Sequence, residues 1–280
     1  MADQNTIALI KSLRERTGAG MMDCKKALEE NGMDIEKAID YLREKGIAKA
    51  AKRADRTAAE GLTKVKVCDK CGKVGMVEVN CETDFVARSD KFIELTDGCL
   101  KYVMQNEPAT IEEAVAGTAQ LFNDASVALG EKLAFKRFSV TTPAEGQGVG
   151  AYIHMGGKIS TYVVLEKADA ELANGLAMHI AANNPTYITL TDVPADIRER
   201  EQNIALAEIA ADPKLASKPD MAKAKIAQGK VDKRLSESCL LFQAYLMDGS
   251  KTIAQVLEEK HNKVVSFVRF QVGEGAEKAA

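Results

Sequence analysis

The chain contains two copies of one pattern, and this repeat constrains its fold more than any other feature. Each copy is an alternating apolar run, a glycine-containing turn and a second alternating run, which is typical of a β-hairpin. The turns align on Gly72 and Gly157, and a helical pattern follows each hairpin, at 90–105 and 169–183. A hairpin with a helix buries one face of its sheet, so the repeat predicts an α+β core of two related subdomains.

The two copies differ between hairpin and helix. The second copy passes directly from Glu166 to Asp169, whereas the first inserts residues 81–89. A loop that a scaffold does not need is a frequent place for function. This loop puts Asp84 beside Phe85 at a strand-to-helix corner. An exposed Phe85 would fit an apolar pocket of another protein, although most phenylalanines pack into their own core.

The N-terminal region predicts a bundle of three short helices. The first covers about 5–16; Asp23 can cap a second that ends at Asn31, and Asp34 can cap a third that ends at Gly46. A bundle of this size is only marginally stable alone. It is either a structural appendage or a docking module.

Two features of this region bear on binding. Met21 and Met22 lie beside flexible glycines, and such methionines make an adaptable apolar surface, which favours docking. Residues 43–56 are locally basic and could contact RNA or an acidic protein face. Because no aromatic residue that could stack on a base lies among these basic residues, we favour a connecting helix there.

Residues 196–235 are rich in alanine and charge and predict two helices, at 196–211 and 220–235. A short break between helices gives an antiparallel pair. With few large apolar residues this pair is expected to project, as an oligomer contact or as an arm for a partner. The sequence then returns to a core-like pattern, with a helix at 250–260 and a strand at 264–272.

The expected organisation follows from these patterns. It comprises a helical bundle with its basic connector (1–56), a first core subdomain (57–145), a second core subdomain in two pieces (146–195 and 236–272), the helical arm (196–235) and a tail (273–280).

Composition leaves little material for catalysis. Three scattered histidines, 5% aromatic residues and no tryptophan among 280 residues argue against a catalytic pocket or a large aromatic-lined cavity. The formal net charge of −3 argues against a dedicated nucleic-acid binder. From these features we expect a protein that is not an enzyme and needs no cofactor. The sequence shows no signal peptide and no apolar run long enough to cross a bilayer, so we expect the chain in the cytoplasm.

Cys68 and Cys71 have the one spacing typical of a metal site. They supply only half of a tetrahedral zinc site, and no second pair with this spacing exists. Cys81 or Cys99 could complete it only by favourable geometry. An ordinary hairpin turn or a redox-labile pair is the simpler interpretation.

Two long segments resemble the bacterial translation elongation factor Ts family. They are residues 13–28 (LRERTGAGMMDCKKAL) and 78–88 (EVNCETDFVAR); HIAA at 179–182 and VRFQVGEG at 268–275 agree with the same family. The resemblance covers nearly the whole chain and keeps the order of the motifs. It implies a guanine-nucleotide exchange factor for elongation factor Tu, whose N-terminal bundle is similar to a ubiquitin-associated domain.

The resemblance also implies roles for individual residues. The loop with Thr83, Asp84 and Phe85 would insert between helices of the partner's GTPase domain near its magnesium site. The other implied contacts are a docking surface in or next to the bundle residues Met21, Met22, Cys24 and Lys25, and a core contact with another domain through His154, Leu246 and Met247. The helical pair would be an arm that can support a homodimer, and neither a membrane nor nucleic acid is an expected partner.

Two other functions stay open from the residues alone. One is a non-enzymatic scaffold or chaperone of elongation factor Tu that uses the bundle and the arm. The other is a zinc-dependent nucleic-acid binder that uses Cys68, Cys71 and the basic connector.

Overall fold

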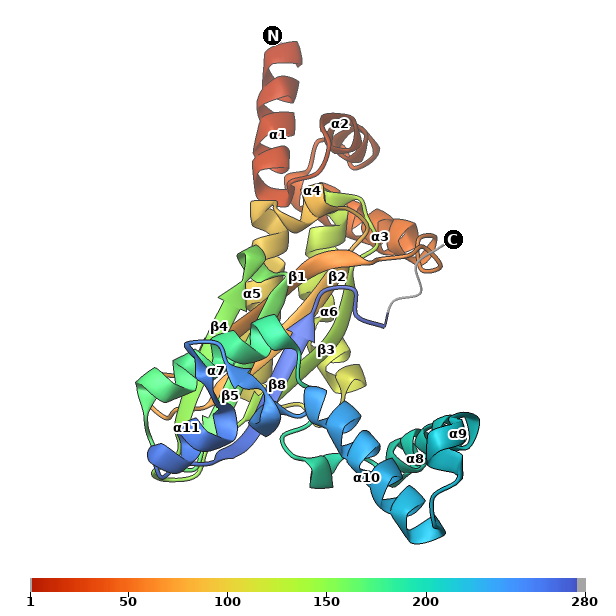
Figure 1. Cartoon of the computed structure of the whole chain (residues 1–280). Helices are drawn as coiled ribbons and strands as arrows, with labels where there is room; N and C mark the ends of the chain where they lie inside the picture. Colours follow the sequence, from red (N-terminus) through yellow and green to blue (C-terminus); the bar gives the residue numbers. More distant parts are fainter. Residues whose placement is uncertain (1, 276–280) are drawn as a thin grey trace. The chain divides into compact units, whose positions relative to one another are not determined.

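The two copies of the repeat form two three-stranded sheets in the computed structural model, which describes residues 2–275. The first sheet has the order β1-β2-β3 and the second the order β4-β5-β8 (Figure 1). Their strands are β1 (Glu60–Val67), β2 (Val74–Cys81), β3 (Ala134–Thr141), β4 (Gly148–His154), β5 (Ile159–Leu165) and β8 (Val264–Gln271). The α+β class is confirmed, and each copy gains a third strand beside the second strand of its hairpin.

Each hairpin is followed by the expected amphipathic helix. α5 (Asp90–Asn106) begins after Ser89, whose hydroxyl accepts a hydrogen bond from the backbone N–H of Phe92. α7 (Ala170–Asn183) begins after Asp169, whose carboxylate accepts from the backbone N–H of Leu172 at 3.0 Å. These side-chain caps satisfy donors that a helix start leaves unpaired. Apolar residues of each helix then pack against the sheet of the same copy.

The first copy contains two elements that the sequence analysis leaves unassigned. α6 (Ile111–Leu129) begins after the capping residue Thr110 and packs beside α5. Gly130 ends it in a left-handed conformation, and β3 follows. Five of the 19 residues of α6 are alanine, and larger apolar side chains such as Phe122 and Leu129 pack on the core of the first copy.

The N-terminal bundle has the three expected helices with different boundaries. They are α1 (Ala2–Thr17), α2 (Met21–Glu30) and α3 (Ile35–Ala51). The prediction that Asp23 caps α2 is wrong: Gly20 is the capping residue and Asp23 lies in the first turn, where its charge still favours the helix start.

The end predicted for α3 at Gly46 is also wrong, because the helix continues to Ala51. Gly46 is buried against α6, and a Cβ atom at this position would lie 2.6 Å from Cγ2 of Val127. The glycine therefore permits close packing of two helices instead of ending one.

The region predicted as a helical arm contains the two expected helices, joined by a short break. It consists of α8 (Ala195–Ala211), a single turn α9 (Pro213–Ala216) and α10 (Asp220–Glu237). α8 and α10 lie side by side (Figure 1). Their seam buries small and branched residues, namely Ala205, Ile209, Ala227 and Val231. Glu208 forms ion pairs with Lys230 and Arg234 across the pair.

Shorter elements complete the chain. They are α4 (Asp84–Ala87), η1 (Met155–Gly157), η2 (Leu190–Asp192), η3 (Leu240–Phe242), β6 (Ala244–Tyr245), β7 (Asp248–Thr252) and α11 (Ile253–Glu259). The helix expected from residue 250 begins instead at Ile253, because the preceding residues pair with β6 and Thr252 caps the helix.

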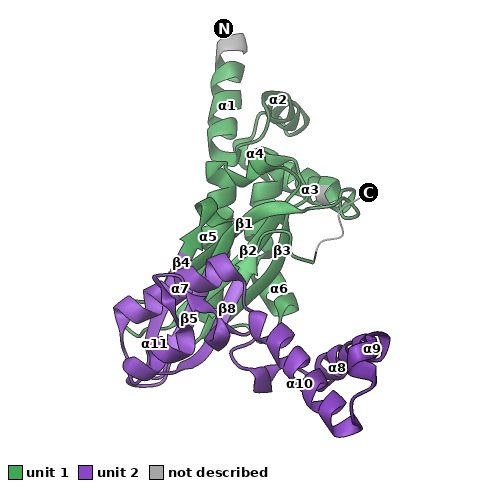
Figure 2. Ribbon diagram, in the orientation of Figure 1, with its two compact units in different colours: residues 1–142, 153–160, 270–280 green, residues 143–152, 161–269 purple. Residues whose placement is uncertain are grey.

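The chain divides into two compact units (Figure 2). Unit 1 contains residues 1–142, 153–160 and 270–280, and unit 2 contains residues 143–152 and 161–269. Unit 1 therefore includes the N-terminal bundle, the first copy of the repeat and the described residues that follow Arg269. Within residues 2–275, no helix is both long and apolar enough to cross a membrane.

The end of β8 and the residues after it are tied to the first sheet within unit 1. Glu78 on β2 is buried, and its carboxylate accepts hydrogen bonds from Arg137 Nε at 2.7 Å and from the backbone N–H of Gly273 at 3.1 Å. Arg137 also pairs with Glu274 and lies over the ring of Phe270. The first residues of the expected tail thus have a fixed place.

Candidate functional site: an exposed phenylalanine on a pinned corner

The inserted loop of the first copy forms a sharp corner between β2 and α5. Thr83 caps the single turn α4, and its hydroxyl accepts a hydrogen bond from the backbone N–H of Val86. Ala87 is buried and Val86 is partly buried against the core of the first copy. The corner is therefore attached to the core from one side of its helical turn.

Glu131, in the loop between α6 and β3, holds this corner from outside. Its carboxylate accepts hydrogen bonds from the backbone N–H of Glu82 (2.9 Å) and of Thr83 (3.0 Å), and from the Thr83 hydroxyl (2.6 Å). In return, the Glu82 carboxylate accepts from the backbone N–H of Lys132 at 2.6 Å. Glu131 is not found from the sequence alone, since no local pattern links two loops that lie about 50 residues apart in the chain.

Phe85 points away from the core at this corner. Its side chain is 83% exposed. Asp84 lies beside it and forms an ion pair with Arg88 at 3.1 Å along the same turn. A large aromatic side chain that water surrounds on a fixed backbone is a ready anchor for an apolar pocket of another protein.

The bundle residues divide into a surface and its support. Met21 and Met22 are 59% and 74% exposed, and Lys25 is exposed beside Glu29. Cys24 is instead fully buried, with its Sγ atom 3.6 Å from the carbonyl oxygen of Ala19. Burial raises the pKa of the Cys24 thiol. Cys24 thus lies under the candidate docking surface and does not belong to its exposed face.

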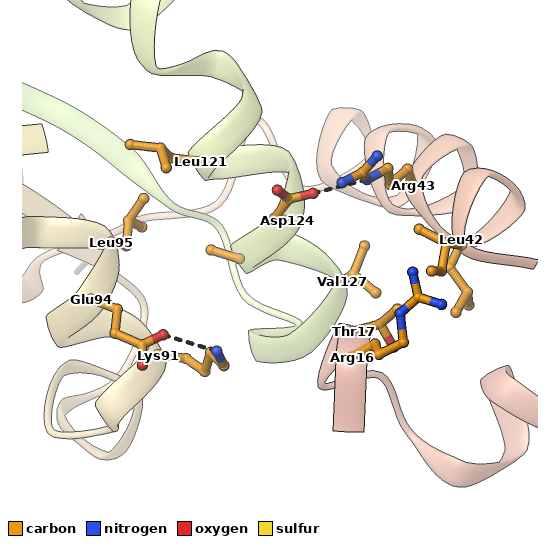
Figure 3. Close-up of a pocket in the computed structure, with 12 residues that line it drawn as sticks. Arg16, Thr17, Leu42, Arg43, Lys91, Glu94, Leu95, Leu121, Asp124 and Val127 are labelled. Atoms are coloured by element: carbon orange, nitrogen blue, oxygen red, sulfur yellow. Dashed lines mark hydrogen bonds and ion pairs between the residues drawn. The ribbon is translucent and has the colours of Figure 1, made fainter. Parts of the chain in front are cut away.

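The bundle packs on α6 within unit 1, and a pocket lies beside this junction (Figure 3). Arg43 of α3 forms an ion pair with Asp124 of α6 at 3.0 Å, and Lys91 pairs with Glu94 on the first turns of α5. The charges that line the pocket are thus largely paired with one another. The arrangement joins the bundle to the first copy and contains no set of groups suited to acid–base chemistry.

Leu246 and Met247 form the exposed turn between β6 and β7 in unit 2. His179 of α7 supports this turn, because its Nδ1 atom lies 3.2 Å from the backbone N–H of Leu246. Gln243 contacts the other ring nitrogen at 2.8 Å. His179 therefore has a structural role in unit 2. His154 lies at the end of β4, in a segment that belongs to unit 1.

Cys68 and Cys71 lie in the turn between β1 and β2 with free thiols. Cys81 and Cys99, the residues considered as further zinc ligands, are buried, and burial raises the pKa of each thiol to about 12. In the part of the chain that the structure describes, no group of three or more histidine, cysteine, aspartate or glutamate residues is placed to hold a metal ion.

Comparison with known proteins supplies the family. The family model described as elongation factor TS matches residues 82–274. The elongation factor Ts of Acholeplasma laidlawii (strain PG-8A) is 44% identical to this chain over 280 residues, which cover 98% of the chain and 94% of that protein. This match includes both the bundle and the corner that carries Phe85. The chain belongs to the elongation factor Ts family of translation elongation factors.

Proposed function

We propose that this protein is a guanine-nucleotide exchange factor for elongation factor Tu, and that the corner at Thr83, Asp84 and Phe85 carries out the exchange. The observation that carries this proposal is the 83% exposure of Phe85 on a backbone held by three hydrogen bonds to Glu131. An exposed phenylalanine has little use in the fold of its own chain. A partner that buries it gains apolar contact without a large cost for ordering the backbone.

The corner would act as a wedge. Phe85 would enter between two packed helices of the partner's GTPase domain, and Asp84 would bind polar groups that the separation exposes. Groups displaced in this way hold the partner's magnesium ion less well. Because magnesium bridges the nucleotide phosphates and neutralises their charge, GDP would then dissociate faster.

Thermodynamic linkage explains how the factor is released. If the exchange protein lowers the affinity of its partner for the nucleotide by a given ratio, the nucleotide lowers the affinity of the partner for the exchange protein by the same ratio. GTP binding would therefore eject the protein from its partner. A 100-fold change in nucleotide affinity needs about 2.7 kcal/mol, which one buried aromatic anchor can supply. No covalent step occurs, so the proposed protein is not an enzyme.

Two further surfaces would hold the partner in place. The exposed methionines Met21 and Met22, with Lys25, would dock the bundle on the GTPase domain. His154, Leu246 and Met247 would contact another domain of the partner. In this arrangement the docking surfaces would provide most of the affinity, and the corner would accelerate the release of GDP. The protein would act in the cytoplasm, and the arm formed by α8 and α10 could join two copies.

The test is stopped-flow release of a fluorescent GDP analogue from elongation factor Tu. The wild-type protein should accelerate release, and Phe85→Ala should abolish most of this acceleration while its binding to nucleotide-free elongation factor Tu is reduced less. Met221→Ala is the matched control, because Met221 on α10 is another strongly exposed apolar side chain. It should leave release unchanged.

The same measurement distinguishes the exchange function from the alternative function as a scaffold. A folded Phe85→Ala variant that accelerates release as the wild type does would show that the corner is not the exchange element. Binding of the wild type to elongation factor Tu without any acceleration would favour a scaffold or chaperone.

A further inference from the structure

The six cysteines of this chain fall into two classes. Cys24, Cys81, Cys99 and Cys239 are buried, and desolvation raises the pKa of each of these thiols. Cys71 is exposed and Cys68 is half-buried, and both lie in one turn of the β1–β2 hairpin. Small reagents can therefore reach this pair while the folded chain shields the other four thiols.

The turn fixes the two cysteines close together. The backbone N–H of Cys68 donates to the carbonyl oxygen of Lys73, and the N–H of Gly72 donates to the carbonyl oxygen of Cys68, both at 2.8 Å. Gly72 has a φ of 67°, which closes the turn in a left-handed conformation. Lys73 is also paired with Glu107 at the end of α5, which anchors the tip of the hairpin.

The turn also favours one sulfur as the nucleophile. A hydrogen bond from the Cys71 thiol, together with the backbone N–H groups of Lys70 and Cys71, lowers the pKa of the Cys68 thiol. Successive backbone N–H groups in a turn form a concave site that stabilises an anion. The thiolate is the reactive form of cysteine, so Cys68 is the better attacking group, and Cys71 lies three residues further on in the same turn.

We propose that Cys68 and Cys71 form a thiol–disulfide exchange site that takes low-molecular-weight disulfides such as oxidised glutathione. The Cys68 thiolate attacks one sulfur of the small disulfide, and the first small thiolate leaves. The Cys71 thiol then loses its proton to water, and the resulting thiolate attacks the Cys68 sulfur of the mixed disulfide and expels the second small thiolate. The two protein thiols are thereby oxidised to an intramolecular disulfide, and the small disulfide is reduced to two thiols.

This site is separate from the proposed exchange corner. β2 runs from the hairpin turn at Val74 to Cys81 beside the corner, and eight residues of strand span roughly 25 Å. Substitution of either turn cysteine should therefore leave nucleotide exchange unchanged, and the proposal stands or falls independently of the exchange function.

The experiment incubates the reduced, folded, full-length protein with oxidised glutathione and follows free thiols and intact mass. The wild type should lose its two reactive thiols, retain no glutathione and recover both thiols with dithiothreitol. Cys71→Ser should retain one glutathione on Cys68, because no second thiol can displace it. Cys68→Ser should form its adduct on Cys71 more slowly than Cys71→Ser does on Cys68.

Three outcomes would overturn the proposal. They are two unreacted thiols in the wild type under excess oxidised glutathione, stable glutathione adducts on both cysteines, and a covalent dimer on a non-reducing gel. Stoichiometric zinc that remains on the reduced protein and blocks oxidation would also overturn it, in favour of a metal site.

Discussion

The two strand-to-helix corners of the repeat are built alike and used differently. In the first copy, Glu131 precedes β3 and accepts hydrogen bonds from the backbone at Glu82 and Thr83. In the second copy, Asn262 precedes β8 and exchanges hydrogen bonds with the backbone N–H and carbonyl oxygen of Lys167, both at 3.0 Å. A polar side chain in front of the third strand thus holds the corner in both copies.

The difference lies in what each corner carries. The second corner is a short link to α7, and Asn262 is almost fully buried. The first corner carries the extra turn α4, and Phe85 on this turn is exposed. The comparison teaches that one scaffold can hold either a bare link or a projecting side chain, because the pin contacts backbone groups and, in the first copy, the Thr83 hydroxyl, but not Phe85.

The largest effect is expected when the exposed side chain of the first corner is removed. Phe85→Ala should slow catalysed GDP release about 100-fold, equivalent to ~2.7 kcal/mol, because it removes the anchor but not the corner. The free energy of unfolding should change by less than about 0.5 kcal/mol, since Phe85 packs on little of its own chain. Stopped-flow release and urea unfolding measure the two effects.

Lys167→Ala in the second corner is the matched control for this prediction. It should leave GDP release unchanged, since that corner carries no projecting side chain. An equal loss in both variants would mean that the two corners do not differ in function.

The next effect concerns the buried pin. Asn262→Ala should lower the free energy of unfolding by about 2 kcal/mol, because it removes the hydrogen bonds that a buried side chain makes with the backbone of Lys167. GDP release should stay near the wild-type rate at temperatures where the variant is folded. Urea unfolding followed by circular dichroism measures the change. An unchanged midpoint would show that the second corner needs no pin.

A smaller effect is expected for Glu131, which is half-buried. Glu131→Ala should lower the free energy of unfolding by about 1 kcal/mol, since water can replace the lost hydrogen bonds. GDP release should fall about tenfold, less than in Phe85→Ala, because the corner becomes mobile but keeps its anchor. Glu131→Gln keeps an acceptor and should lie between wild type and Glu131→Ala. If Glu131→Ala accelerates GDP release as well as the wild type does, the corner does not need Glu131 to hold its position.

The smallest effect is a pH dependence of stability that α7, the helix after the second corner, should contribute and that α5, the helix after the first corner, should not. Cys99 on α5 and His179 on α7 stand at the same distance from their capping residues, Ser89 and Asp169. Burial lowers the pKa of His179, so the unfolded chain binds more protons than the folded one once the pH falls below about 6.5.

The contribution of His179 is therefore fully present above that pH and is lost as the pH falls toward its folded pKa. Urea unfolding at several pH values should show this slope in the wild type and a smaller one in His179→Gln. Cys99 contributes no such slope, because burial raises its pKa to about 12 and keeps it neutral in this range. Identical slopes in wild type and His179→Gln would contradict the prediction.

Periodicity and turn residues predicted most of the elements. The hairpins around Gly72 and Gly157, the helices after them and the helical pair of the arm follow from local patterns that the backbone obeys wherever it lies. α6 and β3 were not assigned from the sequence, although both contain large apolar residues that pack on the core of the first copy. The end predicted at Gly46 failed because the packing of Val127 decides the role of that glycine.

The sequence by itself determined the α+β class, the repeat, the family signatures and the loop that one copy has and the other lacks, since all of these are local or are read by alignment. Only the tertiary structure decided that Phe85 is exposed, that Cys24 is buried, and that Glu131 and Asn262 hold the two corners. Exposure and pinning depend on which distant segments meet. The free energy that brings such segments together comes from burial and buried hydrogen bonds, which no short stretch of sequence specifies alone.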